Sequence, residues 1–541
     1  AGRVFGGDRV LAALTLIGFV PFAARRLLTY LHLFQQEEYD TTRFARWIVA
    51  NHGWDRRLSL ILLALFAAQL ILAGLVLTPP AWLFPALAAA ACLGAAVIEG
   101  DPRRRAKKPL AMTTRARRIY ALSLALVVPL GIGAALSGKF VVAWAVAVQL
   151  VPLALFGANL LLAPLEARVQ RRYWREAHAK LARLHPIVIA VTGSYGKTSV
   201  KHILGHVLET AAPTLITPGS VNTAMGIARV IRERLQPHHR YFVVEMGAYG
   251  IGSIRRLCAL TPPDLGIVTA IGKAHYERFK TLDAVAHAKF ELAEAARDNG
   301  GTVVAAADTL AFAWPREFVA RHRDIVVTVG GEAGADLAIE ALTQEPAGVC
   351  AAIRWRGQAY ELRAPLYGLH QAHNIALAFA AAASLGVPAD DIVTSLKSTP
   401  QIAHRLEVKR QPDGSVMIDD AYNSNPVGFA SALALLDTLR PRDGRRILVT
   451  PGMVELGSEH DAEHDRIGRL AAAHADILVA VAPHRVAPLA AAFADAAPER
   501  DIVACATFAE ARAWLDRNLQ ARDIVLIEND LPDLLEQPLR L

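Results

Sequence analysis

The run Ile189-Ala-Val-Thr-Gly-Ser-Tyr-Gly-Lys-Thr-Ser-Val200 decides the fold of the larger part of the chain. An apolar strand leads into a glycine turn, and a lysine followed by two hydroxyl residues then opens a helix. Gly193 and Gly196 let backbone amides approach a phosphate without a Cβ in the way, and the start of the helix directs its positive end at the same place. A tight turn without a ligand is the alternative, but the strand, the helix and the Lys-Thr-Ser run together favour a cradle for nucleotide phosphates.

The cradle departs slightly from the usual phosphate-binding loop. A strict Walker A pattern has Gly at position 191, where this chain has Val, so the motif takes the shorter GxxGKTS form. We expect Lys197 to neutralise the β- and γ-phosphate oxygens of ATP and Thr198 to coordinate Mg²⁺. The predicted phosphate-binding residues are Gly193, Ser194, Gly196, Lys197, Thr198 and Ser199.

The first third of the chain is rich in long apolar runs. Leu58 to Leu77 contains no charged residue and has about the 20 residues that cross a bilayer core. Buried core helices are the alternative, but uncharged runs of this length separated by strongly basic loops are typical of membrane proteins. We therefore predict about five transmembrane helices in residues 1–165, over Val10 to Ala24, Leu58 to Leu77, Pro79 to Ile98, Ile119 to Leu136 and Phe140 to Ala163.

The basic residues predict the orientation of these helices. Three connections are rich in Arg and Lys, whereas residues 78–80 and 137–139 are short and nearly uncharged. The positive-inside rule places the basic connections in the cytoplasm, the N-terminus outside, and everything after Ala163 inside. The sequence thus predicts a multi-pass protein of the cytoplasmic membrane with cytoplasmic catalytic domains. The three basic connections are Arg25 to Arg57, Arg103 to Arg118 and Arg168 to Arg175.

Composition limits the classes of partner that we expect for this chain. The formal net charge of +8 follows from this topology and from contact with anionic membrane lipids. We expect no nucleic-acid partner, because no basic patch with interleaved aromatic residues is present. The four cysteines are widely scattered and show neither metal-ligand spacing nor a disulfide framework.

The remainder of the chain alternates strand-like and helical stretches, which predicts parallel sheets with crossover helices. Residues 166–186 form a linker helix, residues 187–400 a central ATP-binding domain and residues 401–541 a Rossmann-like C-terminal domain. The fold class is thus an α-helical membrane domain followed by α/β. Ala335 to Leu366 is predicted to be β-rich, and His370 to Leu385 to be helical. The predicted strands are Ile187 to Val191, Tyr241 to Glu245, Leu265 to Thr269, Thr302 to Ala306, Val416 to Ile418, Ile447 to Thr450, Ile477 to Val481 and Ile524 to Ile527.

Further segments follow the cradle in a characteristic order. They are Glu245-Met-Gly-Ala248, Ile271-Gly-Lys-Ala-His275, Ala288-Lys-Phe-Glu291, Gly368-Leu-His370 with Asn374, and Arg405 with Asp419-Asp-Ala-Tyr-Asn-Ser-Asn-Pro426. From about Ile187 to Leu541 the chain closely resembles the Mur ligases, the ATP-dependent amide-forming enzymes of cell-wall precursor synthesis. The resemblance is strongest to the member that adds D-alanyl-D-alanine. It implies a P-loop ATPase domain, a Rossmann-like domain, and ATP with Mg²⁺ as cofactors.

The resemblance also implies a metal site. Glu245 and His275 match Mg²⁺ ligands that act with Thr198, and a carboxylate and an imidazole at neighbouring strand ends suit an ion that bridges phosphates. Lys289 matches a lysine that the family carries as a carbamate, a negative group able to hold a second Mg²⁺. A surface or helix-cap histidine and a solvated helix-face lysine are the alternatives for His275 and Lys289.

The remaining matches concern the nucleotide and the reaction. Asn374 and Asn423 match adenine-side contacts, Asp420 a ribose contact, and Arg405 a phosphate contact from the closing C-terminal domain, while Asp419 could instead cap a turn. The implied reaction starts when a substrate carboxylate attacks the γ-phosphate to give an acyl phosphate and ADP. An amine then displaces phosphate and forms an amide, with Lys197 offsetting charge and no side-chain nucleophile needed.

Three departures from the family bear on the substrate. The UDP-sugar-binding N-terminal domain is replaced by the predicted membrane helices. The family's Thr-x-Gly-Asn-x-Asn-Asn loop is here Thr217-Pro-Gly-Ser-Val-Asn-Thr223. The cationic Lys-Gly-Ser-Arg motif near the C-terminus is here Glu528-Asn-Asp-Leu531, which should disfavour the usual carboxylate-bearing acceptor.

These departures leave three functions open. The leading one is a membrane-anchored amide ligase that acts on an amino acid or peptide and a carboxylate acceptor, either lipid-linked or part of an amino-acid polymer, for the cell envelope. The second is conventional wall-precursor synthesis with a soluble UDP-linked substrate. The third is an ATP-driven transport protein, which charges in the middle of the spans would favour, although the spans contain almost none. A membrane-protein partner or an oligomer is compatible with the first.

Overall fold

The computed structural model describes residues 4–50, 53–75, 77, 79–104, 109–136, 141–272, 279–331, 334–422, 424–454 and 456–531. The predicted site residues His275 and Asn423 lie outside these ranges. The chain divides into two compact units. The first comprises residues 1–169 with 531–541, and the second comprises residues 170–530.

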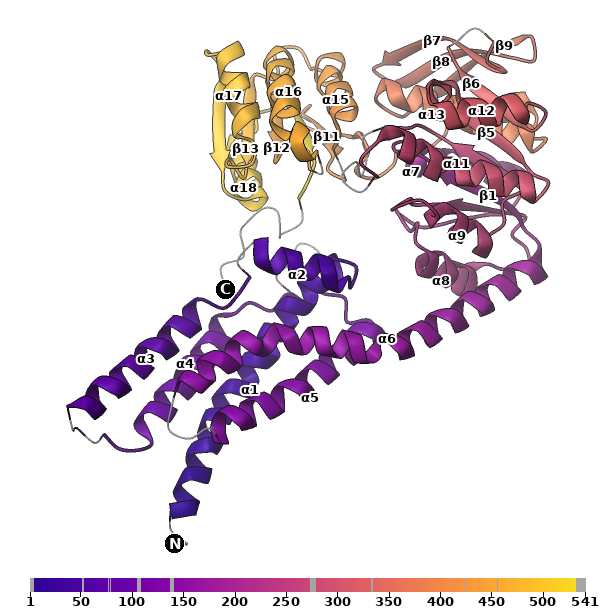
Figure 1. Cartoon of the computed structure of the whole chain (residues 1–541). Coiled ribbons are helices and arrows are strands. Elements are labelled where there is room, and N and C mark those ends of the chain that lie inside the picture. The colour runs from indigo at the N-terminus through magenta and orange to yellow at the C-terminus, as the bar shows by residue number, and fades with distance from the viewer. Residues whose placement is uncertain are drawn as a thin grey trace. The chain divides into compact units, whose positions relative to one another are not determined.

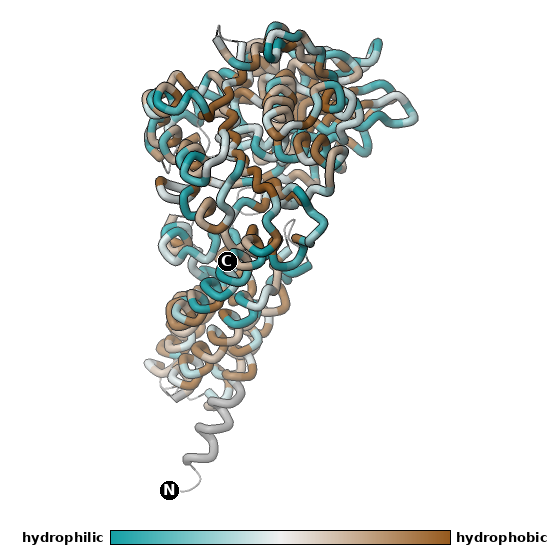
Figure 2. Tube along the Cα trace, turned by 90° about the vertical axis from the view of Figure 1, so that its right-hand side faces the viewer, coloured by the Kyte–Doolittle hydropathy of each residue, from teal (hydrophilic) through white to brown (hydrophobic). Residues whose placement is uncertain are grey.

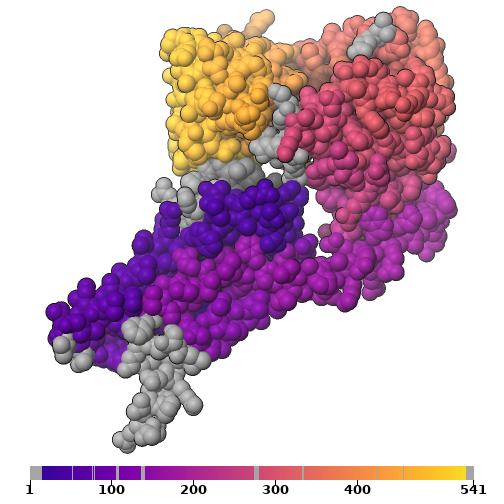
Figure 3. Space-filling model, viewed as in Figure 1, coloured from indigo at the N-terminus to yellow at the C-terminus, as the bar shows by residue number. Residues whose placement is uncertain are grey.

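The first unit is a helical bundle (Figures 1 and 3). The predicted apolar segments fall within helices, and α3, α5 and α6 are long and apolar enough to cross a membrane. Helix α4 is shorter, so the count of five spans stays a prediction. The helices are α1 (Val4–Gln36), α2 (Thr41–Ala50), α3 (Arg57–Gly74), α4 (Leu83–Ile98), α5 (Thr114–Leu136) and α6 (Val142–Leu184).

The bundle has a buried apolar core, and brown segments are frequent along its helices in Figure 2. Helix α1 buries Phe19, Phe22 and Phe34. Large apolar side chains such as Leu60 on α3 and Leu160 on α6 point outward, with 65% and 75% of their surface exposed. Exposed apolar surface on several helices of one bundle is typical of a surface that contacts lipid or another protein.

The buried Arg26 of α1 is paired with acidic residues just outside two other helices. Arg26 is ion-paired with Asp55, which precedes α3, at 2.8 Å and with Glu99, which follows α4, at 3.1 Å. Thr29 also donates a hydrogen bond to Glu99 at 2.6 Å. Because a buried charge is costly unless it is paired, these contacts explain how Arg26 is tolerated just beyond the predicted first span.

Helix α6 joins two predicted elements in one. The last apolar segment and the linker helix form a single helix that continues through Pro152 and Pro164 to Leu184. Only residues 185 and 186 separate its end from strand β1, which begins at Ile187.

The second unit begins with a nine-stranded sheet in the order β2-β3-β1-β4-β5-β6-β7-β8-β9. Strands β1 to β6 pair in parallel with their neighbours, β7 joins β6 in parallel, and β7, β8 and β9 pair antiparallel. The predicted β-rich segment therefore extends the main sheet. The strands are β1 (Ile187–Thr192), β2 (Thr214–Ile216), β3 (Tyr241–Glu245), β4 (Leu265–Val268), β5 (Thr302–Ala306), β6 (Val326–Gly330), β7 (Leu337–Glu345), β8 (Gly348–Trp355) and β9 (Gln358–Ala364).

Helices cover both faces of this sheet (Figure 1). One apolar core contains residues of α7 and α13, and the other contains residues of α8, α9, α11 and α12. This arrangement buries strands that are apolar on both sides, as parallel sheets require. The helices are α7 (Lys197–Ala211), α8 (Ala224–Arg234), α9 (Ser253–Leu260), α11 (Leu282–Asp298), the short η1 (Ala307–Ala311), α12 (Ala313–Arg321), α13 (Leu369–Ser384) and α14 (Ala389–Leu396).

A six-stranded sheet follows, in the order β10-β11-β15-β12-β13-β14, with only the edge pair β10 and β11 antiparallel. Helices α15, α16 and α17 contribute to one apolar core and α18 to another. All predicted strands of both sheets are present, while β2, β6, β10 and β14 were not predicted. The elements are β10 (Glu407–Arg410), β11 (Val416–Asp420), α15 (Pro426–Thr438), β12 (Arg446–Thr450), η2 (Gly457–Glu459), α16 (His460–His474), β13 (Ile477–Val481), α17 (Ala487–Ala496), β14 (Asp501–Cys505), α18 (Phe508–Asn518) and β15 (Ile524–Glu528).

Candidate active site

The predicted phosphate cradle is the turn between β1 and α7. Gly193 and Gly196 have φ angles of 152° and 80°, a region that favours glycine. A Cβ on Gly193 would lie 1.9 Å from Thr269 Oγ1, and one on Gly196 would lie 2.6 Å from Asn374 Oδ1. Both positions therefore need glycine for backbone conformation and for space. Helix α7 starts at Lys197, as the sequence predicted.

Polar side chains hold the cradle from two sides. The Ser194 hydroxyl donates to the Gly272 carbonyl at 3.1 Å and accepts from the Gly272 amide at 2.9 Å. On the other side, Asn374 donates to Gln371 Oε1 at 2.9 Å, and Gln371 donates to Ser199 Oγ at 3.3 Å. The structure thus brings Asn374 of α13 beside the cradle, although this residue is far away in the sequence.

Two lysines converge on one carbonyl of the cradle. Lys197 Nζ lies 2.7 Å and Lys289 Nζ 2.8 Å from the Gly193 carbonyl oxygen. Burial lowers the pKa of Lys197 to about 8, although Glu245 acts in the opposite direction. Burial, and then the charge of Lys197, lower the pKa of Lys289 well below its usual value. Lys289 is only 4% exposed, so the alternative of a solvated lysine on a helix face is wrong.

Glu245 ends β3 and faces the first turn of α7. Its Oε2 accepts from Thr198 Oγ1 at 3.0 Å and from Lys201 Nζ at 3.1 Å, and its Oε1 accepts from Asn222 Nδ2 at 3.4 Å. The structure therefore joins Thr198 and Glu245, two of the predicted metal ligands. Their hydroxyl and carboxylate oxygens are the donors that Mg²⁺ prefers, so the residues fit such an ion.

Lys201 is a residue of this site that the sequence did not predict. It is fully buried, and its Nζ contacts the Gly219 carbonyl as well as Glu245. The available signal was its spacing: Lys201 follows Lys197 by four residues, which places both on one face of α7.

Helix α11, which carries Lys289, is fixed by a second buried carboxylate. Glu291 is 1% exposed and accepts hydrogen bonds from the backbone amides of Gly252 and Arg255 at the start of α9. Helix α9 has no side-chain cap of its own, because Gly252 occupies the N-cap position. Glu291 therefore satisfies amides that would otherwise lack partners at this helix end.

The C-terminal domain contributes two adjacent carboxyl groups. Asp420 on β11 is paired with Glu528 on β15 at the carboxyl ends of these parallel strands. Asp420 Oδ1 accepts from the Leu406 amide at 3.2 Å, and Glu528 Oε1 accepts from Ser424 Oγ at 2.5 Å. Burial raises the pKa of Asp420 to about 6, and burial next to Asp420 raises the pKa of Glu528 well above its usual range.

Arg405 lies in the segment that joins the two α/β domains. Its guanidinium lies over the ring of Tyr422, 4.2 Å from the ring centroid. Its positive charge acts to lower the pKa values of both Lys197 and Asp420. The structure thus places Arg405 within electrostatic reach of the cradle and of the carboxyl pair. His370, at the start of α13, has a pKa lowered to about 4 by burial.

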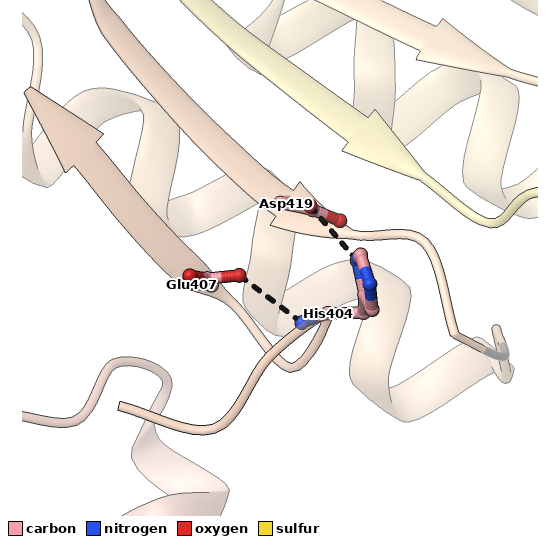
Figure 4. Close-up of side chains that lie close together, drawn as sticks. All are labelled: His404, Glu407 and Asp419. Atoms are coloured by element: carbon pink, nitrogen blue, oxygen red, sulfur yellow. Dashed lines mark hydrogen bonds and ion pairs between the residues drawn. The ribbon is translucent and has the colours of Figure 1, made fainter. Parts of the chain in front are cut away.

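Asp419 belongs to a neighbouring ion-pair cluster (Figure 4). Its Oδ2 lies 2.9 Å from His404 Nδ1, and the His404 amide donates to Glu407 at 3.4 Å. Lys409 Nζ lies 3.1 Å from Glu407 and 3.5 Å from Asp419. Because this ammonium already pairs with both carboxylates, we interpret the cluster as structural. Asp419 Oδ1 also accepts from the Ala421 amide at 3.2 Å, which agrees with the predicted alternative of a turn cap.

Comparison with known proteins agrees with this geometry. The Mur ligase middle domain matches residues 191–382, and the Mur ligase glutamate ligase domain matches residues 404–528. The UDP-N-acetylmuramoyl-tripeptide–D-alanyl-D-alanine ligase of Mycobacterium tuberculosis strain H37Rv is 32% identical over 361 residues, which cover 63% of this chain and 70% of the relative. The enzyme of the same name from Escherichia coli K12 is 31% identical over 286 residues, covering 53% and 62%.

A solved structure supports the same assignment. MurF from Acinetobacter baumannii superposes with a TM-score of 0.56 at 26% identity, covering 66% of this chain and 77% of that one. The matched regions contain the cradle, Glu245, Lys289 and the carboxyl pair described above. The chain therefore belongs to the Mur ligase family and is an ATP-dependent ligase that forms amide bonds.

Proposed function

We propose that this ligase is anchored in the membrane and joins an amine to a membrane-proximal carboxylate of cell-envelope biosynthesis. The observation that carries this proposal is helix α6. It is apolar at its start and ends two residues before β1, the strand that leads into the phosphate cradle. The predicted membrane segment thus continues as one helix to the residues just before β1, in a region that precedes the match to the family.

The site residues support the use of ATP and Mg²⁺. Lys197 and the amides of the cradle would bind the phosphates, while Thr198 and Glu245, with His275, would hold the metal ion. A bound Mg²⁺ would offset the negative charge of the phosphate oxygens. Asn374 is positioned beside the cradle for a contact with the nucleotide, and Asn423 and Asp420 stay predicted contacts to adenine and ribose.

The reaction that we propose has two steps. An oxygen of the substrate carboxylate attacks the γ-phosphorus, and the bond to the β-phosphate oxygen breaks, which gives an acyl phosphate and ADP. The amine nitrogen then attacks the acyl carbon, loses a proton, and displaces phosphate. Lys197 and Arg405 offset negative charge as it builds up, and closure of the C-terminal domain would exclude water from the acyl phosphate.

The buried amine of Lys289 suits conversion to a carbamate. A neutral amine attacks the carbon of CO₂ and releases one proton, which leaves a group with one negative charge. Burial beside Lys197 favours the neutral amine that this step requires. The carbamate would exchange a repulsive ammonium for an anion next to Lys197 and would supply a ligand for a second Mg²⁺.

The acceptor is the least conventional part of the proposal. Glu528 stands where similar ligases carry the Lys of a Lys-Gly-Ser-Arg motif, and it lies beside Asp420. Acidic side chains offer no cation to pair with a carboxylate-bearing acceptor such as a dipeptide with a free C-terminus. Conventional synthesis from soluble precursors is the second candidate, because the relatives named above act on UDP-N-acetylmuramoyl-tripeptide and D-alanyl-D-alanine.

The deciding experiment measures release of ADP and phosphate by the full chain in detergent or lipid discs. One panel contains UDP-N-acetylmuramoyl-tripeptide with D-alanyl-D-alanine, and the other contains lipid-linked acids with single amino acids. Mass spectrometry then identifies the product, and Lys197→Ala serves as the inactive control. Turnover with the lipid-linked panel alone is expected. Turnover with the soluble panel alone would favour the second candidate.

Membrane topology is tested separately. A tag inserted at Ser137-Gly138, outside the described residues, should be labelled from outside intact cells, and a C-terminal tag should not. Labelling of the C-terminal tag in intact cells would contradict a cytoplasmic ligase.

A further inference from the structure

Lys201 is a fully buried cation that the proposed reaction does not use. It lies on α7, one helical turn after the phosphate-binding Lys197. Its Nζ is 3.1 Å from Glu245 Oε2 and also contacts the Gly219 carbonyl. Both groups of the ion pair are at most 2% exposed. A buried ion pair is seldom retained for stability alone, because an apolar side chain of similar size often serves as well.

The partner of Lys201 is the predicted metal ligand Glu245, and other contacts tie the same residue to residues 217–223. The Glu245 amide donates to Thr217 Oγ1 at 3.1 Å, and Asn222 Nδ2 donates to Glu245 Oε1 at 3.4 Å. The Gly247 amide also donates to the Asn222 carbonyl at 3.1 Å. The backbone and the side chain of Glu245 are therefore both hydrogen-bonded to this loop. Among these contacts, Lys201 is the charged group that reaches both the loop and the Glu245 carboxylate.

We propose that Lys201 is a positioning residue that holds the Glu245 carboxylate against loop 217–223 and so sets the affinity of the site for a divalent cation. Because Lys201 contacts both the Gly219 carbonyl and the Glu245 carboxylate, it links the position of the loop to that of the metal ligand. Outer partners of metal ligands commonly act in this way, and their loss typically lowers metal affinity about 10- to 100-fold. This inference rests on the proposed use of ATP and Mg²⁺.

A purely structural lysine would behave differently. Its removal would lower the thermal stability and weaken nucleotide binding to the same extent with and without Mg²⁺. A positioning lysine changes the dependence on Mg²⁺ itself. The distinguishing measurement is therefore the Mg²⁺ concentration that gives half-maximal binding of a fluorescent ADP analogue, compared with binding in EDTA.

The experiment uses the full chain with Lys201→Met, which keeps length and removes charge, and Lys201→Arg, which keeps charge. Lys397→Met, at an exposed position on the end of α14, is the matched control. We expect Lys201→Met to raise the half-saturating Mg²⁺ concentration about tenfold or more. Binding in EDTA should stay within about twofold, Lys201→Arg should recover part of the loss, and Lys397→Met should match the unchanged protein.

The outcomes separate the two proposals. An unchanged half-saturating concentration in folded Lys201→Met, or an equal loss in EDTA, overturns the positioning role alone. If Lys201→Met does not fold, Lys201→Gln, which also removes the charge but keeps a polar end, takes its place. Normal Mg²⁺ dependence in folded Lys201→Gln then overturns the role. Failure of the unchanged protein to bind the analogue at any Mg²⁺ concentration overturns the proposed nucleotide use as well.

Discussion

The carboxyl edges of the two sheets carry buried ionisable groups of opposite type, basic at one sheet and acidic at the other. At the nine-stranded sheet, burial lowers the pKa values of Lys197 and Lys289, whereas at the six-stranded sheet it raises those of Asp420 and Glu528. At each edge, burial disfavours the charged forms of these side chains, and a ligand of opposite charge would stabilise those forms. The basic edge suits phosphates and matches the family. The acidic edge carries Glu528, where the family resemblance leads us to expect a cationic motif, and it is the part of the site on which the proposed choice of acceptor depends.

The largest effect is expected at the basic edge. Lys197→Ala and Glu245→Ala should each lower ATP turnover about 100-fold or more, because they remove groups that offset phosphate charge or hold the metal. Circular dichroism should remain unchanged, and Lys397→Ala should retain activity. Substantial turnover in either variant would remove the basis for the assignment of the cradle.

Substitution of Lys289 tests whether this buried amine is converted to a negatively charged carbamate. Lys289→Ala should reduce turnover about tenfold or more, and a small carboxylate such as acetate should restore part of it. The unchanged enzyme should lose activity when CO₂ and bicarbonate are removed and recover when bicarbonate returns. Indifference to bicarbonate together with an active Lys289→Ala variant would leave this residue a plain lysine.

Arg405 links the two edges. Arg405→Ala should lower kcat/KM for ATP by about tenfold, because it removes a positive charge that would offset phosphate charge in the closed site. The melting temperature should change little, because the side chain is half-buried and stacks on the exposed Tyr422. Tyr422→Ala is the matched control, as it removes the stacking contact and leaves the charge. A larger loss of activity in Tyr422→Ala would assign the effect to stacking.

The smallest effect concerns the acidic edge and its dependence on pH. The folded-state pKa values of Asp420 and Glu528 are raised, so their contribution to stability is full below the unfolded pKa, near 4. It is lost as the pH rises through the folded-state values, which is about 6 for Asp420 and well above the usual range for Glu528. Glu528→Gln removes one ionisable group and offers Asp420 an amide donor. Its Tm should exceed that of the unchanged protein by about 1–3 °C at pH 8 and by less at pH 5. The exposed Glu499→Gln should show no such difference.

The sequence predicted the fold well because its signals are local. Apolar strands, glycine turns and uncharged runs specify their own structure, and the strand from Ile187, the helix from Lys197 and the apolar segments appear where these patterns lie. The same reasoning missed β14, a short strand at the edge of the sheet whose apolar run Ile502-Val-Ala-Cys505 is mostly exposed. The predicted domain boundaries stay predictions.

The candidate site was predictable where a residue belongs to a motif. Thr198 and Glu245 come together as expected, and so do Asn374 and the cradle. Lys201 and Glu291 escaped prediction because a buried charge has the same sequence signature as a solvated one, and only tertiary packing reveals the partner. The pairing of Asp420 with Glu528 depends on strand order, which sequence alone does not provide.

The carboxylate of Glu291 makes two helices cooperative. Because Glu291 of α11 caps α9, the first turn of α9 is stable only while α11 is folded and in place. Local opening of either helix should therefore open both, and would displace Lys289, two residues away from the cap. Amide hydrogen exchange in the first turn of α9 should then report on the integrity of the ligase centre without any substrate present. Glu291→Ala should speed exchange there while leaving exchange in the six-stranded domain unchanged.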